Sequence, residues 1–259
     1  MVESKKPVTP GVDSARRVLQ VLLMFSEDRS SFTVDEAVRH LGISTPSAYR
    51  YISLLKEMAL VEEHSYSHYS LTPRVFALGR AAEAAFTLPD SVRPTLERLA
   101  MSSGETALVM RRLNDSAVCA DMAEINHTVR LSFSVGHTLP LHRGAAAKVL
   151  LAYMGEAWCE SYVSRTEPGL AETERRRLLR ELGLIRERGW AQSASEVDEG
   201  IWATAAPVRY GGRVIAALTV AGPLYRIDRA RADAIHAEVL EEAAQLSRDA
   251  AANELKEGS

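Results

Sequence analysis

Apolar residues near the start of the chain follow a helical spacing twice, with a glycine between the two runs. Thr33 and Glu36 precede the first run with the spacing of a capping box, and Gly42 ends it, because a residue without Cβ adopts the left-handed conformation readily. Pro46 fits the first turn of a second helix over residues 45–58. The apolar positions are Val34, Ala37, Val38 and Leu41, then Ala48, Ile52, Leu55 and Met58.

Two short alternating runs, residues 60–63 and 69–71, follow the second helix and flank a polar segment with a tyrosine. Such runs indicate a β-hairpin. A helix, a turn, a second helix and a hairpin form the outline of a winged helix-turn-helix, which reads double-stranded DNA with its second helix. An ordinary small helical domain is the alternative, since helix pairs with a glycine turn also occur outside DNA-binding proteins.

Outward polar and basic side chains of this region are the candidates for contact with operator DNA. The start of a recognition helix reaches the bases, and its flanks hold phosphates. The candidates are Arg16, Arg17, Thr33, Ser44, Thr45, Ser47, Tyr49, Arg50, Ser53, Lys56 and Arg74, with Lys5 and Lys6 as further phosphate contacts.

Charge predicts weak DNA binding by a single copy. The net charge of the chain is −3, and residues 13–90 hold eight Lys or Arg against ten Asp or Glu. Because affinity for DNA depends on how many phosphates are neutralised, two copies on a repeated site would bind more tightly than one. We therefore expect a homodimer. The acidic balance, with Glu62 and Glu63 in the hairpin, leaves a protein-interaction module with a degenerate winged helix as an alternative.

The chain of 259 residues is much longer than a winged helix requires, so a second domain is expected. Helical spacing predicts a linker helix, and prolines at 89 and 94 break it. One continuous domain with a proline-rich loop is the alternative. The predicted division is 1–12 as a disordered arm, 13–72 as the winged helix-turn-helix domain, 73–89 as the linker helix, 90–252 as the second domain and 253–259 as a tail.

Composition predicts a cytoplasmic protein without a membrane segment. Hydrophobic residues make up 46% of the chain and charged residues 25%, as in soluble globular proteins. No apolar run is long enough to span a bilayer, and residues 1–10 lack the apolar core of a signal peptide. Cys119 and Cys159 form neither a metal-ligand spacing nor a disulfide framework. We expect no metal and no cofactor.

The second half alternates apolar strands with amphipathic helices. The pattern predicts an α+β domain, a meandering sheet with helices packed on one side, and a strong hairpin signal at Gly211 and Gly212. The predicted strands are 106–110, 117–122, 129–133, 138–141, 190–193, 203–209 and 214–220, and the predicted helices are 95–102, 145–154, 172–188 and 228–252.

A candidate ligand site lies where Gly144 leads into a helix that begins with three alanines. Small side chains leave the backbone N–H groups of the first turn uncovered at the positive end of the helix dipole. Such a helix start binds anions, and a carboxylate is the expected occupant. Close packing of the alanines against the sheet is the alternative.

The order and spacing of these motifs resemble the IclR family of transcriptional regulators from about residue 13 to residue 251. The resemblance implies a winged-helix DNA reader, repressor or activator, joined to a GAF-like domain that binds a small organic acid. It also implies homodimers through the N-terminal domain that pair into tetramers. The segments that carry the resemblance include Leu41-Gly42-Ile43, Ala48-Tyr49-Arg50, Leu71-Thr72-Pro73-Arg74, Gly104-Glu105-Thr106, Arg130-Leu131, Leu139-Pro140-Leu141-His142, Lys148-Val149-Leu150-Leu151-Ala152, Arg186-Glu187-Arg188-Gly189-Trp190, Ala205-Ala206-Pro207-Val208 and Gly222-Pro223.

Carried over by position, the resemblance implies eight effector contacts in the second domain. The chain departs from the family at Ala147, where a glycine is usual, and at Trp202, where an arginine is common. Ser193, Ala203 and Ala221 are also less polar than their counterparts in relatives that bind very small acids. The departures favour a larger, partly apolar acid, aromatic acids included. For Trp202, a place in the core or in a subunit contact is the alternative. The implied contacts are Leu131, Leu139, Ala145, Ala146, Ser193, Ala203, Thr219 and Ala221.

An enzyme is the remaining alternative. His137, His142, Lys148, Cys119 and Asp121 are titratable, and a buried neutral lysine can form a Schiff base. The sequence has no nucleophile elbow, no histidine spacing for a metal and no phosphate loop. We therefore expect no catalysis. The expected mechanism is an effector that shifts the balance between arrangements of the DNA-binding domains.

Overall fold

The computed structural model describes residues 11–26, 29–64, 67–85, 88–125, 131, 133–167 and 170–257. The chain forms two compact units, Met1–Thr87 and Leu88–Ser259. Three of the sequence predictions lie outside the described residues, wholly or in part: the arm with Lys5 and Lys6, residues 86–87 of the linker helix, and most of the strand predicted at 129–133. Leu131 and Phe133, which are described, do not belong to a strand.

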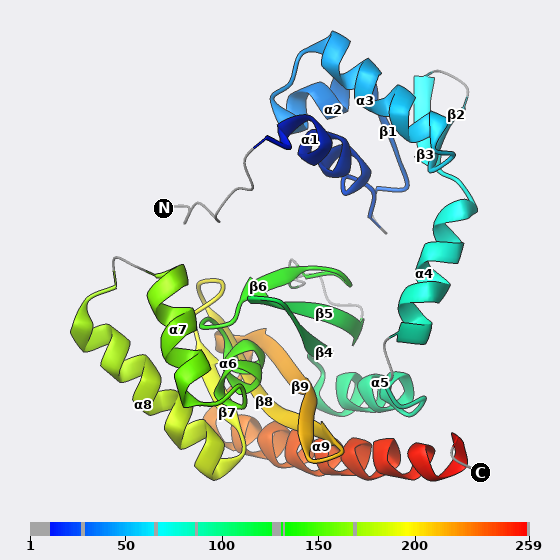
Figure 1. The fold of residues 1–259 in the computed structure, drawn as a ribbon. Coiled ribbons are helices and arrows are strands. Elements are labelled where there is room, and N and C mark those ends of the chain that lie inside the picture. The colour runs from blue at the N-terminus through cyan, green and yellow to red at the C-terminus, as the bar shows by residue number, and fades with distance from the viewer. Residues whose placement is uncertain are drawn as a thin grey trace. The chain divides into compact units, whose positions relative to one another are not determined.

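The first unit is a winged helix-turn-helix (Figure 1). Its antiparallel sheet has the strand order β1-β3-β2, and its core surrounds Phe32 and Ile52. The sequence pattern did not predict α1 or β1. The elements are α1 (Asp13–Leu22), β1 (Ser31–Thr33), α2 (Val34–Leu41), α3 (Thr45–Glu57), β2 (Val61–His64), β3 (His68–Leu71) and α4 (Arg74–Ala85).

Helix α2 begins and ends as its sequence predicts. The Glu36 N–H donates to Thr33 Oγ1 at 3.3 Å, and the Thr33 N–H donates to the Glu36 carboxylate at 2.7 Å, which completes the capping box. Gly42 ends the helix with φ +60°. Helix α3 differs from its prediction at one inward position. Met58 lies just past the helix end and is 48% exposed, whereas Tyr51 is buried in its place.

The second unit is built on one antiparallel sheet of six strands in the order β6-β5-β4-β9-β8-β7. The predicted α+β class is confirmed, and helix α7 is an element that the sequence pattern did not predict. The elements are α5 (Val92–Ser103), β4 (Thr106–Leu113), β5 (Ser116–Ala123), β6 (Thr138–Pro140), α6 (Ala145–Ala152), α7 (Glu156–Thr166), α8 (Glu172–Arg188), β7 (Ala191–Ala194), β8 (Ile201–Tyr210), β9 (Arg213–Pro223) and α9 (Arg229–Glu257).

Helices cover both faces of this sheet, so the prediction that they pack on one side only was wrong. Helices α6, α7 and α8 lie on one face, and α5 and α9 lie on the other (Figure 1). Along β4, Ala107 and Val109 pack toward α5 and α9, whereas Leu108 and Met110 pack toward α6. Consecutive apolar residues in a central strand therefore mean burial on both faces.

Two local predictions in the second unit agree with the structure, and a third is modified. Helix α8 has the predicted bounds, and the β8–β9 hairpin turns at Gly211 and Gly212, both with positive φ. Helix α9 starts after Asp228, whose carboxylate accepts a hydrogen bond from the Arg231 N–H, and it continues to Glu257, into the predicted tail. None of the described helices is long and apolar enough to cross a bilayer.

Candidate functional site

Helix α3 presents a polar, exposed face in the first unit. Tyr49 is 51% exposed, and the Arg50 guanidinium lies 5.5 Å from the centre of the Tyr51 ring. Ser44 and Ser47, at the helix start, share a hydrogen bond of 3.0 Å between their hydroxyl groups. A helix that lies in the major groove presents side chains of this kind to the bases. The exposed members of the predicted set on this face are Ser44, Thr45, Tyr49, Arg50, Ser53 and Lys56.

Lys56, a predicted phosphate contact on α3, is bound by the wing. Its Nζ lies 2.6 Å from Glu63 Oε2 in β2, and this hydrogen bond raises the pKa of Lys56. Both side chains are about 40% exposed, so solvent screens the pair. The Lys56 ammonium keeps two further donors, so it can contact a phosphate beside Glu63 or in place of it.

The other predicted DNA contacts differ in whether their side chains already bind groups within the protein. Arg16 pairs with the aspartate three positions earlier at 2.6 Å. Arg17 donates to the backbone oxygen of Leu41 at 3.1 Å, where it satisfies a carbonyl in the last turn of α2. Thr33 serves as the cap of α2. Arg74 is exposed at the start of α4.

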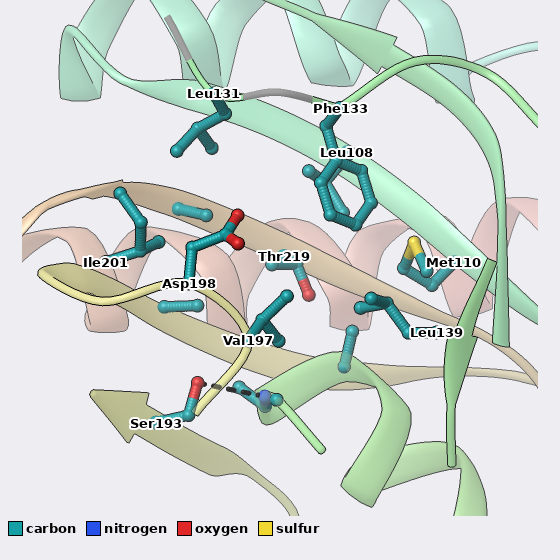
Figure 2. Close-up of a pocket in the computed structure, with 15 residues that line it drawn as sticks. Leu108, Met110, Leu131, Phe133, Leu139, Ser193, Val197, Asp198, Ile201 and Thr219 are labelled. Carbon is teal, nitrogen blue, oxygen red and sulfur yellow. Dashed lines mark hydrogen bonds between the residues drawn. The ribbon is translucent and has the colours of Figure 1, made fainter. Parts of the chain in front are cut away.

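The second unit contains a pocket between the sheet and the start of α6 (Figure 2). All eight predicted effector contacts line it, although their role in binding stays a prediction. The pocket contains about 530 Å³ of empty space, its open mouth included. Gly144, which the sequence placed at this ligand site, also lines the pocket. Sequence reasoning missed six further lining residues: Leu108, Met110, Phe133, Val197, Asp198 and Ile201.

Two hydroxyl groups supply polar atoms in this apolar pocket. Thr219 is 3% exposed, and its Oγ1 is buried without a hydrogen-bond partner among the described residues. Ser193 Oγ accepts a hydrogen bond from the Ala145 N–H at 3.1 Å, drawn as the dashed line in Figure 2, which leaves its own proton free to donate. A buried unpaired hydroxyl costs about 1–3 kcal/mol, so a ligand that bonded Thr219 would recover part of that free energy.

The start of α6 is more covered than its sequence predicts. The Gly144 N–H donates to Glu196 Oε2 at 3.0 Å, and the Ala145 N–H donates to Ser193. Sequence reasoning missed Glu196 because it is far from α6 along the chain. The N–H of Ala146, which lines the pocket, has no hydrogen-bond partner among the described residues. The helix start thus offers fewer free donors than we predicted.

Lys148 lies in the first turns of α6 and is held by two glutamates. Its side chain is 2% exposed, and its Nζ lies 2.5 Å from Glu181 Oε1 in α8 and 2.6 Å from Glu196 Oε1. Glu196 uses its second oxygen for the Gly144 N–H. One carboxylate therefore connects the start of α6, the buried lysine and the loop after β7.

The pocket is apolar for a different reason than the sequence suggested. Trp202 is buried on the opposite face of the sheet, in the core beneath α5 and α9, so it does not line the pocket. Of the places that the sequence left open for Trp202, the structure shows the core rather than the pocket, because β8 places the side chain on that face. Among the described lining residues, Asp198 is the only charged one.

The residues weighed for catalysis do not form an active site. His142 Nδ1 and Tyr162 Oη share a hydrogen bond of 3.0 Å, and His142 Nε2 lies 3.2 Å from Glu167 Oε1. Burial lowers the pKa of His142. Burial raises the pKa of the Cys119 thiol to about 12, and it also raises that of Cys159. Within the described part of the chain, no three His, Cys, Asp or Glu side chains are grouped as metal ligands.

Two family profiles match most of the chain. Residues 14–65 match the IclR helix-turn-helix domain. Residues 84–248 match the C-terminal domain of the bacterial transcriptional regulator IclR. The matched segments contain helix α3 in the first unit and the pocket in the second.

Similar proteins of known name are transcriptional regulators rather than enzymes. The regulator KipR of Bacillus subtilis is 26% identical over 225 residues, which cover 85% of this chain and 90% of that protein. The transcriptional repressor IclR of Escherichia coli is 25% identical over 251 residues, which cover 93% of this chain and 91% of that protein. A crystal structure of an IclR homologue from Microbacterium hydrocarbonoxydans, complexed with 4-hydroxybenzoate, has the same fold, with a TM-score of 0.74 and 22% identity over 92% of this chain and 99% of that one. The chain therefore belongs to the IclR family of bacterial transcriptional regulators.

Proposed function

We propose that the chain binds operator DNA through α3 and that a small organic acid in the pocket of the second unit controls this binding. The observation that carries the effector part is the buried, unpaired hydroxyl of Thr219 in a mostly apolar pocket. Buried polar groups are normally paired, so an unpaired one in a pocket indicates a place for a ligand.

The proposed ligand is a monocarboxylic acid with an apolar body, aromatic acids included. Its carboxylate would accept hydrogen bonds from the hydroxyls of Ser193 and Thr219 and from the Ala146 N–H, beside the positive end of α6. Its apolar body would pack against Leu108 and Phe133. The 4-hydroxybenzoate bound by the Microbacterium homologue is an acid of this kind, which supports the choice of benzoates as probes.

We further propose that the chain acts in the bacterial cytoplasm as a homodimer, joined through the first unit, or as a dimer of dimers. Large apolar side chains are exposed there: Leu19 is 57%, Leu23 80% and Phe76 75% exposed. Leu19 and Leu23 are one helical turn apart at the end of α1, and neighbouring exposed apolar side chains favour a protein contact surface. The effector would act by its different affinities for the arrangements of the DNA-binding units in the dimer.

A gel shift on the DNA upstream of its own gene tests the DNA part. We expect salt-sensitive binding that Arg50→Ala weakens at least about tenfold. Arg39→Ala is the matched control, because Arg39 is exposed on α2 and donates to the Asp35 carbonyl of its own helix. Equal binding by the Arg50 and Arg39 variants, or none by the wild type at low salt, would contradict the proposal.

A thermal-shift panel of monocarboxylic acids tests the effector part, because a ligand that binds only the native state raises the midpoint. We expect benzoates to raise it, and Thr219→Val to weaken their affinity without loss of the fold. Thr204→Val is the matched control in the neighbouring strand, since Thr204 bonds His236, outside the pocket. The effector proposal fails if no acid shifts the midpoint, or if a bound acid leaves operator affinity unchanged.

A further inference from the structure

The loop between β7 and β8, residues 195–200, holds the mouth of the pocket in a fixed conformation. The Gly200 N–H donates to Ser195 Oγ at 3.0 Å, and the Ser195 N–H donates to the Ile201 carbonyl at 2.8 Å. Glu196 is held at both carboxylate oxygens by Gly144 and Lys148. The residues that follow Glu196 are therefore presented to the pocket by a well-connected loop.

Asp198 is the one charged side chain that this loop brings to the pocket. Figure 2 shows its carboxylate directed into the space between Leu131 and Thr219. The side chain is exposed at the mouth, and its carboxylate has no hydrogen-bond or ion-pair partner among the described residues. A carboxylate accepts hydrogen bonds and repels anions, so it distinguishes the chemical groups that a ligand can place at this end of the pocket.

The two ends of the pocket therefore differ in chemistry. At the inner end, the Ser193 hydroxyl and the Ala146 N–H are donors, and Thr219 adds a hydroxyl that both donates and accepts. At the mouth, the Asp198 carboxylate is an acceptor only. No described lining residue is a cation that could neutralise a second ligand carboxylate.

We propose that Asp198 determines specificity by selecting acids with one carboxylate and a hydrogen-bond donor at the opposite end, and by rejecting dicarboxylates. This inference rests on the proposed function, because it requires an acid in the pocket. A phenolic hydroxyl that donates to Asp198 forms a charge-assisted hydrogen bond. A second carboxylate in the same place faces a like charge. Because Asp198 is exposed, we expect each effect to be about tenfold in affinity, the low end for charged hydrogen bonds.

Calorimetric titration of the full chain with three acids of one shape tests the proposal. Benzoate has no group at the far end, 4-hydroxybenzoate has a donor there, and benzene-1,4-dicarboxylate has a second carboxylate. For the wild type we expect 4-hydroxybenzoate to bind about ten times tighter than benzoate, and the dicarboxylate to bind weakest. Asp198→Ala should remove the advantage of 4-hydroxybenzoate, and Asp198→Asn should tighten dicarboxylate binding about tenfold.

Glu199→Gln is the matched control, because it removes a carboxylate from the next, exposed position, which does not line the pocket. It should leave the order of the three acids unchanged. If benzoate binds and the order is the same in the wild type and both Asp198 variants, the specificity role is wrong while the effector proposal stands. If none of the three acids binds the wild type, both the effector proposal and this inference are overturned. Thermal midpoints of the variants establish that each is folded.

Discussion

Replacement of Lys148 by methionine measures how strongly the ion-pair cluster stabilises the second unit. Methionine is close to lysine in length and apolar, so it fills most of the space that the side chain occupies. The change removes the ammonium that both glutamates contact, at 2.5 Å for Glu181 and 2.6 Å for Glu196. Their two oxygens then lie close together without a counter-charge.

The expected loss follows from the geometry of the two glutamates. Like charges about 5 Å apart repel by about 3 kcal/mol at an effective dielectric constant of about 20. Removal of one partner from a buried ion pair costs about 3–5 kcal/mol. Both glutamate side chains are 34% exposed and can turn toward water, which lowers the cost. We expect the free energy of unfolding to fall by about 2–3 kcal/mol.

Urea unfolding followed by tryptophan fluorescence is the assay, because all three tryptophans lie in the second unit. Arg176→Met is the control: Arg176 pairs with Glu172 at 2.7 Å, but the two side chains are 69% and 62% exposed. An exposed pair of this kind contributes less than about 0.5 kcal/mol. A double variant that combines Lys148→Met with Glu181→Gln should recover part of the lost free energy of unfolding. Equal stability of the two single variants would refute the reasoning.

Three further predictions concern Gly144, Thr33 and Cys119. Gly144→Ala should lower the free energy of unfolding by about 1–3 kcal/mol, because φ is +86° and the added Cβ would lie 2.8 Å from Val197. Gly155→Ala has the same backbone strain but no close neighbour, so it should lower the free energy of unfolding less in the same urea assay. Thr33→Ala should cost the first unit about 1 kcal/mol by loss of the cap, measured by circular dichroism. Because the pKa of Cys119 is raised in the folded state, its neutral thiol contributes to the free energy of unfolding fully below about pH 9, and this contribution is lost toward pH 12. A thiol reagent should not label Cys119 at pH 8 until the protein unfolds.

Local signals explain the sequence predictions that the structure supports. The bounds of α2 depend on Thr33, Glu36 and Gly42, all within one short segment, and each fixes backbone hydrogen bonds of its immediate neighbours. The β8–β9 hairpin likewise follows from two adjacent glycines. Family resemblance, rather than periodicity, predicted the eight pocket residues that the sheet and α6 bring together.

Features that depend on distant residues could not be predicted in the same way. The face on which Trp202 lies is set by the pairing of β8 with β7 and β9, and a shift of one residue would reverse it. Glu196 meets the start of α6 only after folding. Helix α7, by contrast, has a local signal, since Cys159, Tyr162 and Val163 recur at helical spacing and are buried.

The sheet of the second unit also separates the residues that shape the pocket from those that form the core on its other face. Leu108 and Thr219 face the pocket, while their chain neighbours Val109 and Leu218 belong to the core beneath α5 and α9. Substitutions at the pocket-facing positions change the cavity without repacking the other layer. A library confined to those positions should therefore give folded sensors for new small molecules at little loss of stability, which suits the scaffold to the design of biosensors.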